Sequence, residues 1–174
     1  MAQTLAAVSY AFPWSGLIGQ YKFGNRPGWA PFFSRLMLNN SVVASCLADL
    51  RPGDWVLPLP LSPQRLQTRG FNQSWLLAQQ LARHSHTEAH ADARLLLRIR
   101  DTRPQSQLLR DERLTNVKGA FMVDPLRASQ LVGRHVVLVD DVMTSGASIY
   151  TAAQALHDAG AAKVTAMVLA RTEP

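Results

Sequence analysis

Residues 135–148 constrain the fold of this chain more than any other segment. Four consecutive apolar residues, Val136 to Val139, predict a strand that is covered on both faces, as in a parallel sheet. Two carboxylates, Asp140 and Asp141, follow where that strand is expected to end. Because ligands bind beyond the carboxyl ends of strands in open α/β sheets, the acid pair is predicted to face a ligand.

The turn that follows the acid pair predicts an anion site. It carries short hydroxyls and a glycine and leads into a helix predicted over residues 149–159, whose N-terminal N–H groups would favour an anion. Its residues are Thr144, Ser145, Gly146, Ala147 and Ser148. Carboxylates for sugar hydroxyls or a metal, beside a cradle for phosphate, predict a site for a phosphorylated sugar. An acid pair alone would equally fit an Asx-type turn without a ligand.

A second polar cluster lies upstream, after the predicted strand that begins at Asp54. Arg65 and Arg69 are one helical turn apart and could point at one anion, while Gly70 permits a close backbone approach. The planar guanidinium group suits phosphate oxygens. The alternative is a helix-capping loop with two solvated arginines.

The remaining pattern predicts an α/β fold. Apolar residues at helical spacing predict a helix that begins near Leu36 and stops before Pro52, and a second helix over residues 73–83. Further strands are predicted over residues 94–99, 121–123 and 163–170. Strands that alternate with helices favour a parallel sheet flanked by helices.

Composition bounds the class of protein. The 174 residues, 47% hydrophobic and 17% charged, suffice for one globular domain, and no apolar run approaches the roughly 18 residues of a membrane span. Residues 1–10 lack the basic start of a signal peptide, so a cytoplasmic protein is expected. The formal charge of +6 suits phosphate-rich small ligands and nucleic acid alike.

Metal sites made of cysteine and histidine are not expected. Cys46 is the only cysteine, which excludes an internal disulfide and a cysteine-rich zinc site. His84, His86 and His90 have a spacing that could collect a metal, but no cysteine or carboxylate set completes the site. We expect a solvated loop there, and no zinc.

Residues 135–148 resemble the phosphoribosyl-diphosphate (PRPP) motif of type I phosphoribosyltransferases. The resemblance implies that Asp140 and Asp141 face the ribose 2′ and 3′ hydroxyls, bind Mg²⁺ and are candidate catalytic residues. It also implies that residues 144–148 wrap the 5′-phosphate and that the loop with Arg65, Arg69 and Gly70 binds pyrophosphate. The fold implied is Rossmann-like, with a small hood expected from residues 1–50 and a core from residues 51–174.

Other segments resemble a narrower group, the ComF/GntX proteins. The resemblance is carried by Arg69-Gly70-Phe71-Asn72-Gln73, by Tyr21-Lys22-Phe23-Gly24, and by a middle segment that runs from Gln105 to Phe121. Many members have a four-cysteine zinc module, for which this chain has no cysteines. The group includes competence proteins for natural transformation, which implies a link to DNA uptake.

The arginine-rich segment at residues 101–118 lies where these enzymes have a loop that closes over PRPP. Arg103, Gln105, Arg110 and Arg113 would supply polar and cationic groups to such a lid, and Arg103 and Arg113 are the candidate catalytic residues on it. The alternative is an ordinary exposed loop with solvated arginines.

Two functions fit this sequence. The first is transfer of a phosphoribosyl group from PRPP to an acceptor that the sequence does not identify; Thr144 stands where purine-salvage members have an aspartate, so a purine base is not expected. The second is a non-catalytic module that binds PRPP or single-stranded DNA, with competence proteins as partners. Either protein could be a homodimer.

Overall fold

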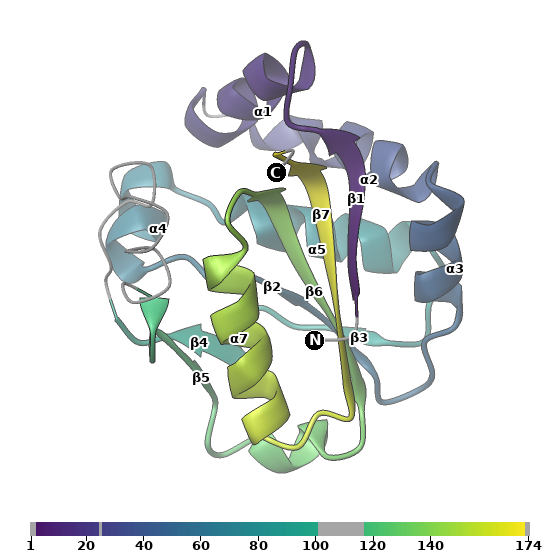
Figure 1. The fold of residues 1–174 in the computed structure, drawn as a ribbon, viewed down its shortest axis with the longest axis vertical. Coiled ribbons are helices and arrows are strands. Elements are labelled where there is room, and N and C mark those ends of the chain that lie inside the picture. The colour runs from purple at the N-terminus through teal and green to yellow at the C-terminus, as the bar shows by residue number, and fades with distance from the viewer. Residues whose placement is uncertain (1–2, 25, 101–116, 173–174) are drawn as a thin grey trace.

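A five-stranded parallel sheet with helices on both faces forms the centre of the protein (Figure 1). The structure is a computed structural model that describes residues 3–24, 26–100 and 117–172. The strand order is β1-β7-β6-β2-β3, and every neighbouring pair is parallel. These strands are β1 (Gln3–Ser9), β2 (Trp55–Pro58), β3 (His90–Ala91), β6 (His135–Met143) and β7 (Lys163–Arg171). The predicted α/β class is confirmed.

Helices cover the sheet, and a short antiparallel ladder stands beside it. The helices are α1 (Trp14–Phe23), α2 (Ala30–Leu38), α3 (Ser41–Ala48), α4 (Pro63–Arg69), α5 (Gln73–His84) and α7 (Ala147–Asp158). The 3₁₀ turns are η1 (Pro27–Trp29) and η3 (Ala128–Leu131), and the ladder pairs β4 (Leu96–Arg98) with β5 (Phe121–Val123). No helix among the described residues is long and apolar enough to span a membrane.

Alternate side chains of β6 enter two different cores. Val136 and Leu138 belong to the cluster that contains residues of α7, while Val137 and Val139 belong to the cluster that contains residues of α2 and α5. All four side chains are fully buried. Burial of each contributes on the order of 1.5–3 kcal/mol, so β6 is held from both faces. This anchoring fixes the position of the acid pair at its end.

The topology of the sheet changes direction between β2 and β6. From β2 the chain moves outward to β3, whereas from β6 it moves to β7 on the opposite side. The β2 ladder with β6 ends at the pair Pro58 and Val139, and the Leu59 N–H then donates to the Val139 carbonyl at 2.7 Å. Asp140 is the next residue, so the acid pair lies at the switch point where open α/β sheets bind ligands.

Strand β6 extends beyond its predicted end, and β1 and β3 are strands that the sequence did not predict. Strand β3 contains His90, where a solvated loop was expected, because it pairs with β2 at the edge of the sheet. Strand β6 does not end before the acid pair but continues to Met143, because β7 offers partners as far as Arg171. Residues 3–9, expected within the hood, form the edge strand β1, which pairs with β7 from Gln3 to Ser9. The other described residues before Leu50 are mainly helical. The division of domains at residue 50 stays a prediction.

The helix predicted from Leu36 to Leu50 is two helices. A break between α2 and α3 places Asn40 in an extended conformation, and its side-chain oxygen accepts the Val42 N–H at 3.0 Å. An asparagine N-cap satisfies a donor that a new helix leaves without a partner, so the break is stable. The strand predicted over residues 94–99 is β4, which pairs with β5 and not with the central sheet.

Candidate functional site

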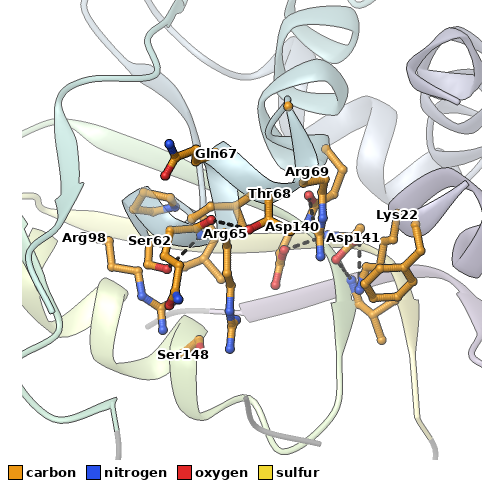
Figure 2. Close-up of a pocket in the computed structure, with 18 of the residues that line it drawn as sticks. Lys22, Ser62, Arg65, Gln67, Thr68, Arg69, Arg98, Asp140, Asp141 and Ser148 are labelled. Atoms are coloured by element: carbon orange, nitrogen blue, oxygen red, sulfur yellow. Dashed lines mark hydrogen bonds and ion pairs between the residues drawn. The ribbon is translucent and has the colours of Figure 1, made fainter. Parts of the chain in front are cut away.

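A pocket of about 1100 Å³ opens at the carboxyl ends of β2 and β6 (Figure 2). Its walls come from α1, the segment after β2, α4, β4, the end of β6 and the start of α7. The lining residues are Tyr10, Lys22, Phe23, Leu59, Pro60, Leu61, Ser62, Gln64, Arg65, Gln67, Thr68, Arg69, Gly70, Gln73, Arg98, Asp140, Asp141, Val142, Thr144 and Ser148. Segments far apart in the sequence therefore meet at the switch point.

Hydrogen bonds fix both carboxylates of the acid pair. Asp140 Oδ1 accepts from the Ser74 hydroxyl at 2.8 Å and from the Asp141 N–H at 2.9 Å. Asp141 Oδ1 accepts from the Val142 N–H at 2.7 Å. Ser74 lies in the first turn of α5 and is fully buried, so its hydroxyl is dedicated to this contact. Sequence reasoning missed Ser74, because nothing local connects it to Asp140.

Lys22 neutralises the second carboxylate. Its ammonium, at the end of α1, lies 2.9 Å from Asp141 Oδ2. Asp141 is only 2% exposed, and Oδ2 accepts no hydrogen bond within the described part of the chain. The ion pair is therefore what compensates the charge of this buried oxygen. The sequence singled out Lys22 only within a family motif and gave it no role at the site.

Burial and charge act together on Asp140. Burial first, and the neighbouring Asp141 carboxylate second, raise the pKa of Asp140 to about 7. Lys22 and the Ser74 hydrogen bond act in the opposite direction. Two ionised carboxylates at this buried position are therefore unfavourable, and a nearby cation favours their charged forms.

The arginines predicted to bind an anion lie on α4. The Ser62 side chain accepts the Arg65 N–H at 3.4 Å and caps this helix. Gly70 ends it with a φ of +80°, a conformation that glycine adopts without strain. Arg65, Arg69 and Gly70 all line the pocket. Their role in binding pyrophosphate stays a prediction.

The Arg69 guanidinium is held on two sides. Its Nη1 donates to Gln73 Oε1, and its Cζ lies 5.1 Å from the centroid of the Phe23 ring. A guanidinium stacked on an aromatic ring and bonded to an amide loses little freedom when it binds an anion. Phe23 also follows Lys22 directly, so the end of α1 contacts both Asp141 and Arg69.

Only part of the predicted phosphate turn lines the pocket. Thr144 and Ser148 line the pocket, whereas Ser145, Gly146 and Ala147 are not among its lining residues. Gly146 is the N-cap of α7 with a φ of +75°, and the Ser145 hydroxyl oxygen accepts the Ala147 N–H at 3.4 Å. The turn therefore positions the start of α7 against the pocket.

Arg98 adds a cation to the site that nothing in the sequence pattern indicated. It comes from β4, and its Cζ lies 5.4 Å from the centroid of the Phe121 ring. In the view of Figure 2, Arg98 and Lys22 lie at opposite ends of the pocket, with the acid pair between them. The lining contains four cations and two carboxylates, a net charge of +2. Arg103 and Arg113 lie outside the described residues.

The acid pair does not fit a magnesium ion in this arrangement. Magnesium binds carboxylate oxygens at about 2.0–2.1 Å, and the Lys22 ammonium already stands 2.9 Å from Asp141 Oδ2. A divalent ion at that oxygen would face the lysine charge directly. Elsewhere, the described residues contain no group of three or more histidine, cysteine, aspartate or glutamate side chains able to hold a metal, and His84, His86 and His90 form none.

Comparison with known proteins agrees with this architecture. The phosphoribosyl transferase domain matches residues 77–173, more than half of the chain. DNA utilization protein YhgH of Escherichia coli (strain K12) is 40% identical over 172 residues, which cover 98% of this chain and 73% of that protein. Competence protein F of Haemophilus influenzae is 30% identical over 162 residues, with coverages of 93% and 69%.

A third relative matches a smaller part of the chain. Competence protein ComFC of Bacillus subtilis (strain 168) is 34% identical over 118 residues, which cover 67% of this chain and 44% of that protein. The matched domain, together with the identity to relatives over nearly the whole chain, decides the family. The chain belongs to the phosphoribosyl transferase family and, within it, to the ComF-type proteins.

Proposed function

We propose that this chain binds PRPP at the switch-point pocket and transfers its phosphoribosyl group to an acceptor that is still to be identified. The observation that carries the proposal is the meeting of the acid pair, the α4 arginines and the α7 turn around one cavity. The acid pair supplies acceptors for a ribose diol. The arginines supply donors for a diphosphate, and the N-terminus of α7 favours a monophosphate.

Phosphoribosyl transfer requires these residues to orient the substrate and to stabilise charge. Displacement of pyrophosphate from C1 by a nitrogen nucleophile passes through a state that resembles an oxocarbenium ion. Orientation of the ribose by Asp140, together with stabilisation of the leaving group by Arg65 and Arg69, would supply much of the acceleration. No covalent intermediate with a side chain is needed in this scheme.

Binding of PRPP to the acid-pair variants tests the site. We expect titration calorimetry to give a measurable PRPP affinity for the wild type, and Asp140→Asn to weaken it at least about tenfold, or 1.4 kcal/mol. Asp49→Asn is the matched control, since Asp49 is exposed at the end of α3 and lies outside the pocket. Equal PRPP affinity for wild type and Asp140→Asn would contradict the assignment.

The names of the relatives favour a second function, in DNA uptake. One relative is called a DNA utilization protein and two are called competence proteins. In this version the chain is a non-catalytic module that binds PRPP or single-stranded DNA. Release of pyrophosphate from PRPP with candidate bases, abolished by Asp141→Asn, would favour the enzyme. DNA binding that weakens steeply with salt, without turnover, would favour the module.

A further inference from the structure

We propose that Lys22 is a built-in cation of the acid pair, which lets the pocket bind the ribose 5-phosphate part of its ligand without a divalent metal. This inference rests on the proposed function. Lys22 is a positioning residue in this scheme: it acts through Asp141, which its ion pair holds in a fixed orientation beside Asp140.

The first support is the ion pair itself. The Lys22 ammonium lies 2.9 Å from Asp141 Oδ2, and the side chains are 19% and 3% exposed. A buried carboxylate needs a partner to keep its charge, and Lys22 is the cation that provides it. A metal at the same oxygen would have to displace the lysine.

The second support is the anchoring of the helix end that carries Lys22. Tyr21 is fully buried, its hydroxyl donates to the Gln73 carbonyl at 2.9 Å, and its ring packs against Phe33 and Phe71 at 5.3 and 6.1 Å between centroids. The next residue after Lys22, Phe23, lies beneath Arg69. Both neighbours therefore fix the Lys22 backbone against the pocket, and the ammonium is held in place beside Asp141.

The third support is the balance of charge. Lys22 offsets one negative charge of the acid pair, and the arginines of the lining leave the whole pocket net positive. An anionic sugar phosphate then meets attraction without a metal to screen the carboxylates. Figure 2 shows Lys22 beyond Asp141 and away from Arg65, so the two cations serve different parts of the pocket.

The test uses ribose 5-phosphate as the probe, because it lacks the diphosphate that would itself bring magnesium. Calorimetry is run on the full chain in excess EDTA and again with saturating MgCl₂. We expect the wild-type affinity to change less than about twofold between the two buffers. Lys22→Met should bind at least about tenfold more weakly in EDTA and recover part of this loss with magnesium, which can then reach the acid pair.

Two further variants keep the test decisive. Lys22→Arg preserves the charge and should bind like the wild type, whether or not Lys22→Met folds. Lys163→Met removes a lysine from the exposed start of β7, at the opposite end of the sheet, and should leave the affinity unchanged. Recovery of Lys22→Met by magnesium is a response that a purely structural lysine would not produce.

The outcomes separate the two proposals. A wild-type protein that binds ribose 5-phosphate only with magnesium would overturn the role of Lys22 and leave the pocket assignment standing. So would a Lys22→Met protein whose affinity equals that of the wild type in both buffers. A wild-type protein that binds neither ribose 5-phosphate nor PRPP in either buffer would remove both proposals.

Discussion

Loss of the Lys22 charge should destabilise the protein, because the buried Asp141 carboxylate would be left without its cation. At 2.9 Å, two unit charges attract by about 6 kcal/mol at an effective dielectric constant of about 20. Desolvation of both groups offsets part of this attraction, and breaking a buried pair from one side costs about 3–5 kcal/mol. Because the Lys22 side chain keeps 19% of its exposure, we take the lower end, about 3 kcal/mol.

A double-mutant cycle measures this contribution. Lys22→Met, Asp141→Asn and the double variant are unfolded in urea beside the wild type. We expect Lys22→Met to lower the free energy of unfolding by about 3 kcal/mol and the melting temperature by about 6–12 °C. The double variant should recover at least about 2 kcal/mol of this loss, because it also removes the Asp141 carboxylate that Lys22→Met leaves without its cation.

A small coupling energy would refute the reasoning. If the cycle gives less than about 0.5 kcal/mol, the pair behaves like an exposed ion pair and Lys22 is not held at Asp141. Lys163→Met serves as the control for general loss of a lysine, and its effect should stay within about 0.5 kcal/mol. An unchanged slope of unfolding free energy against urea would show that the variants unfold from the same native state.

Two further predictions concern contacts around the site, and a third concerns His135 at the opposite end of β6. Ser74→Ala removes the hydroxyl that bonds to Asp140 at 2.8 Å and should weaken PRPP binding about three- to tenfold by calorimetry, with little change in fold. Gly146→Ala should lower the free energy of unfolding by about 1–2 kcal/mol in urea, since φ is +75° and the new Cβ would lie 3.0 Å from the Tyr150 ring. Burial, with a smaller effect of a nearby lysine, lowers the pKa of His135 below its ordinary value. As the pH falls, the unfolded chain therefore binds this proton before the folded protein does. The contribution of His135 to the free energy of unfolding falls as the pH drops below about 6.5. The difference between the urea midpoints of the wild type and His135→Gln, measured across this pH range, isolates the effect.

The parts of the fold that the sequence predicted correctly are those whose pattern is local. Strand β6, the acid pair and the start of α7 occupy one continuous segment, so the change from an apolar run to a polar turn and a helix is visible in the sequence. The helix predicted over residues 73–83 is equally local and is α5. In each case the physical requirement and the residue that meets it lie within a few positions.

The parts that escaped prediction depend on partners far away in the chain. Strand β1 is an edge strand of seven residues, and it is defined by pairing with β7 at the other end of the sequence. Ser74 and Asp140 are 66 positions apart, and the Lys22 pair with Asp141 spans a still greater separation. No periodicity or spacing signals such contacts, because the sheet alone brings these residues together.

The acid pair also bears on the choice between a small ligand and DNA. Carboxylates at the middle of the pocket repel backbone phosphates, and they recognise a sugar by its vicinal hydroxyls. Deoxyribose lacks the 2′ hydroxyl, so DNA offers the pair no diol. We therefore expect short single-stranded DNA to displace ribose 5-phosphate poorly in a competition titration, even at low salt. If DNA binds this chain tightly and ribose 5-phosphate remains bound, the DNA uses another surface. Stoichiometric displacement by DNA would instead mean that the pocket reads phosphate charge alone, and that Asp140 and Asp141 do not select the sugar.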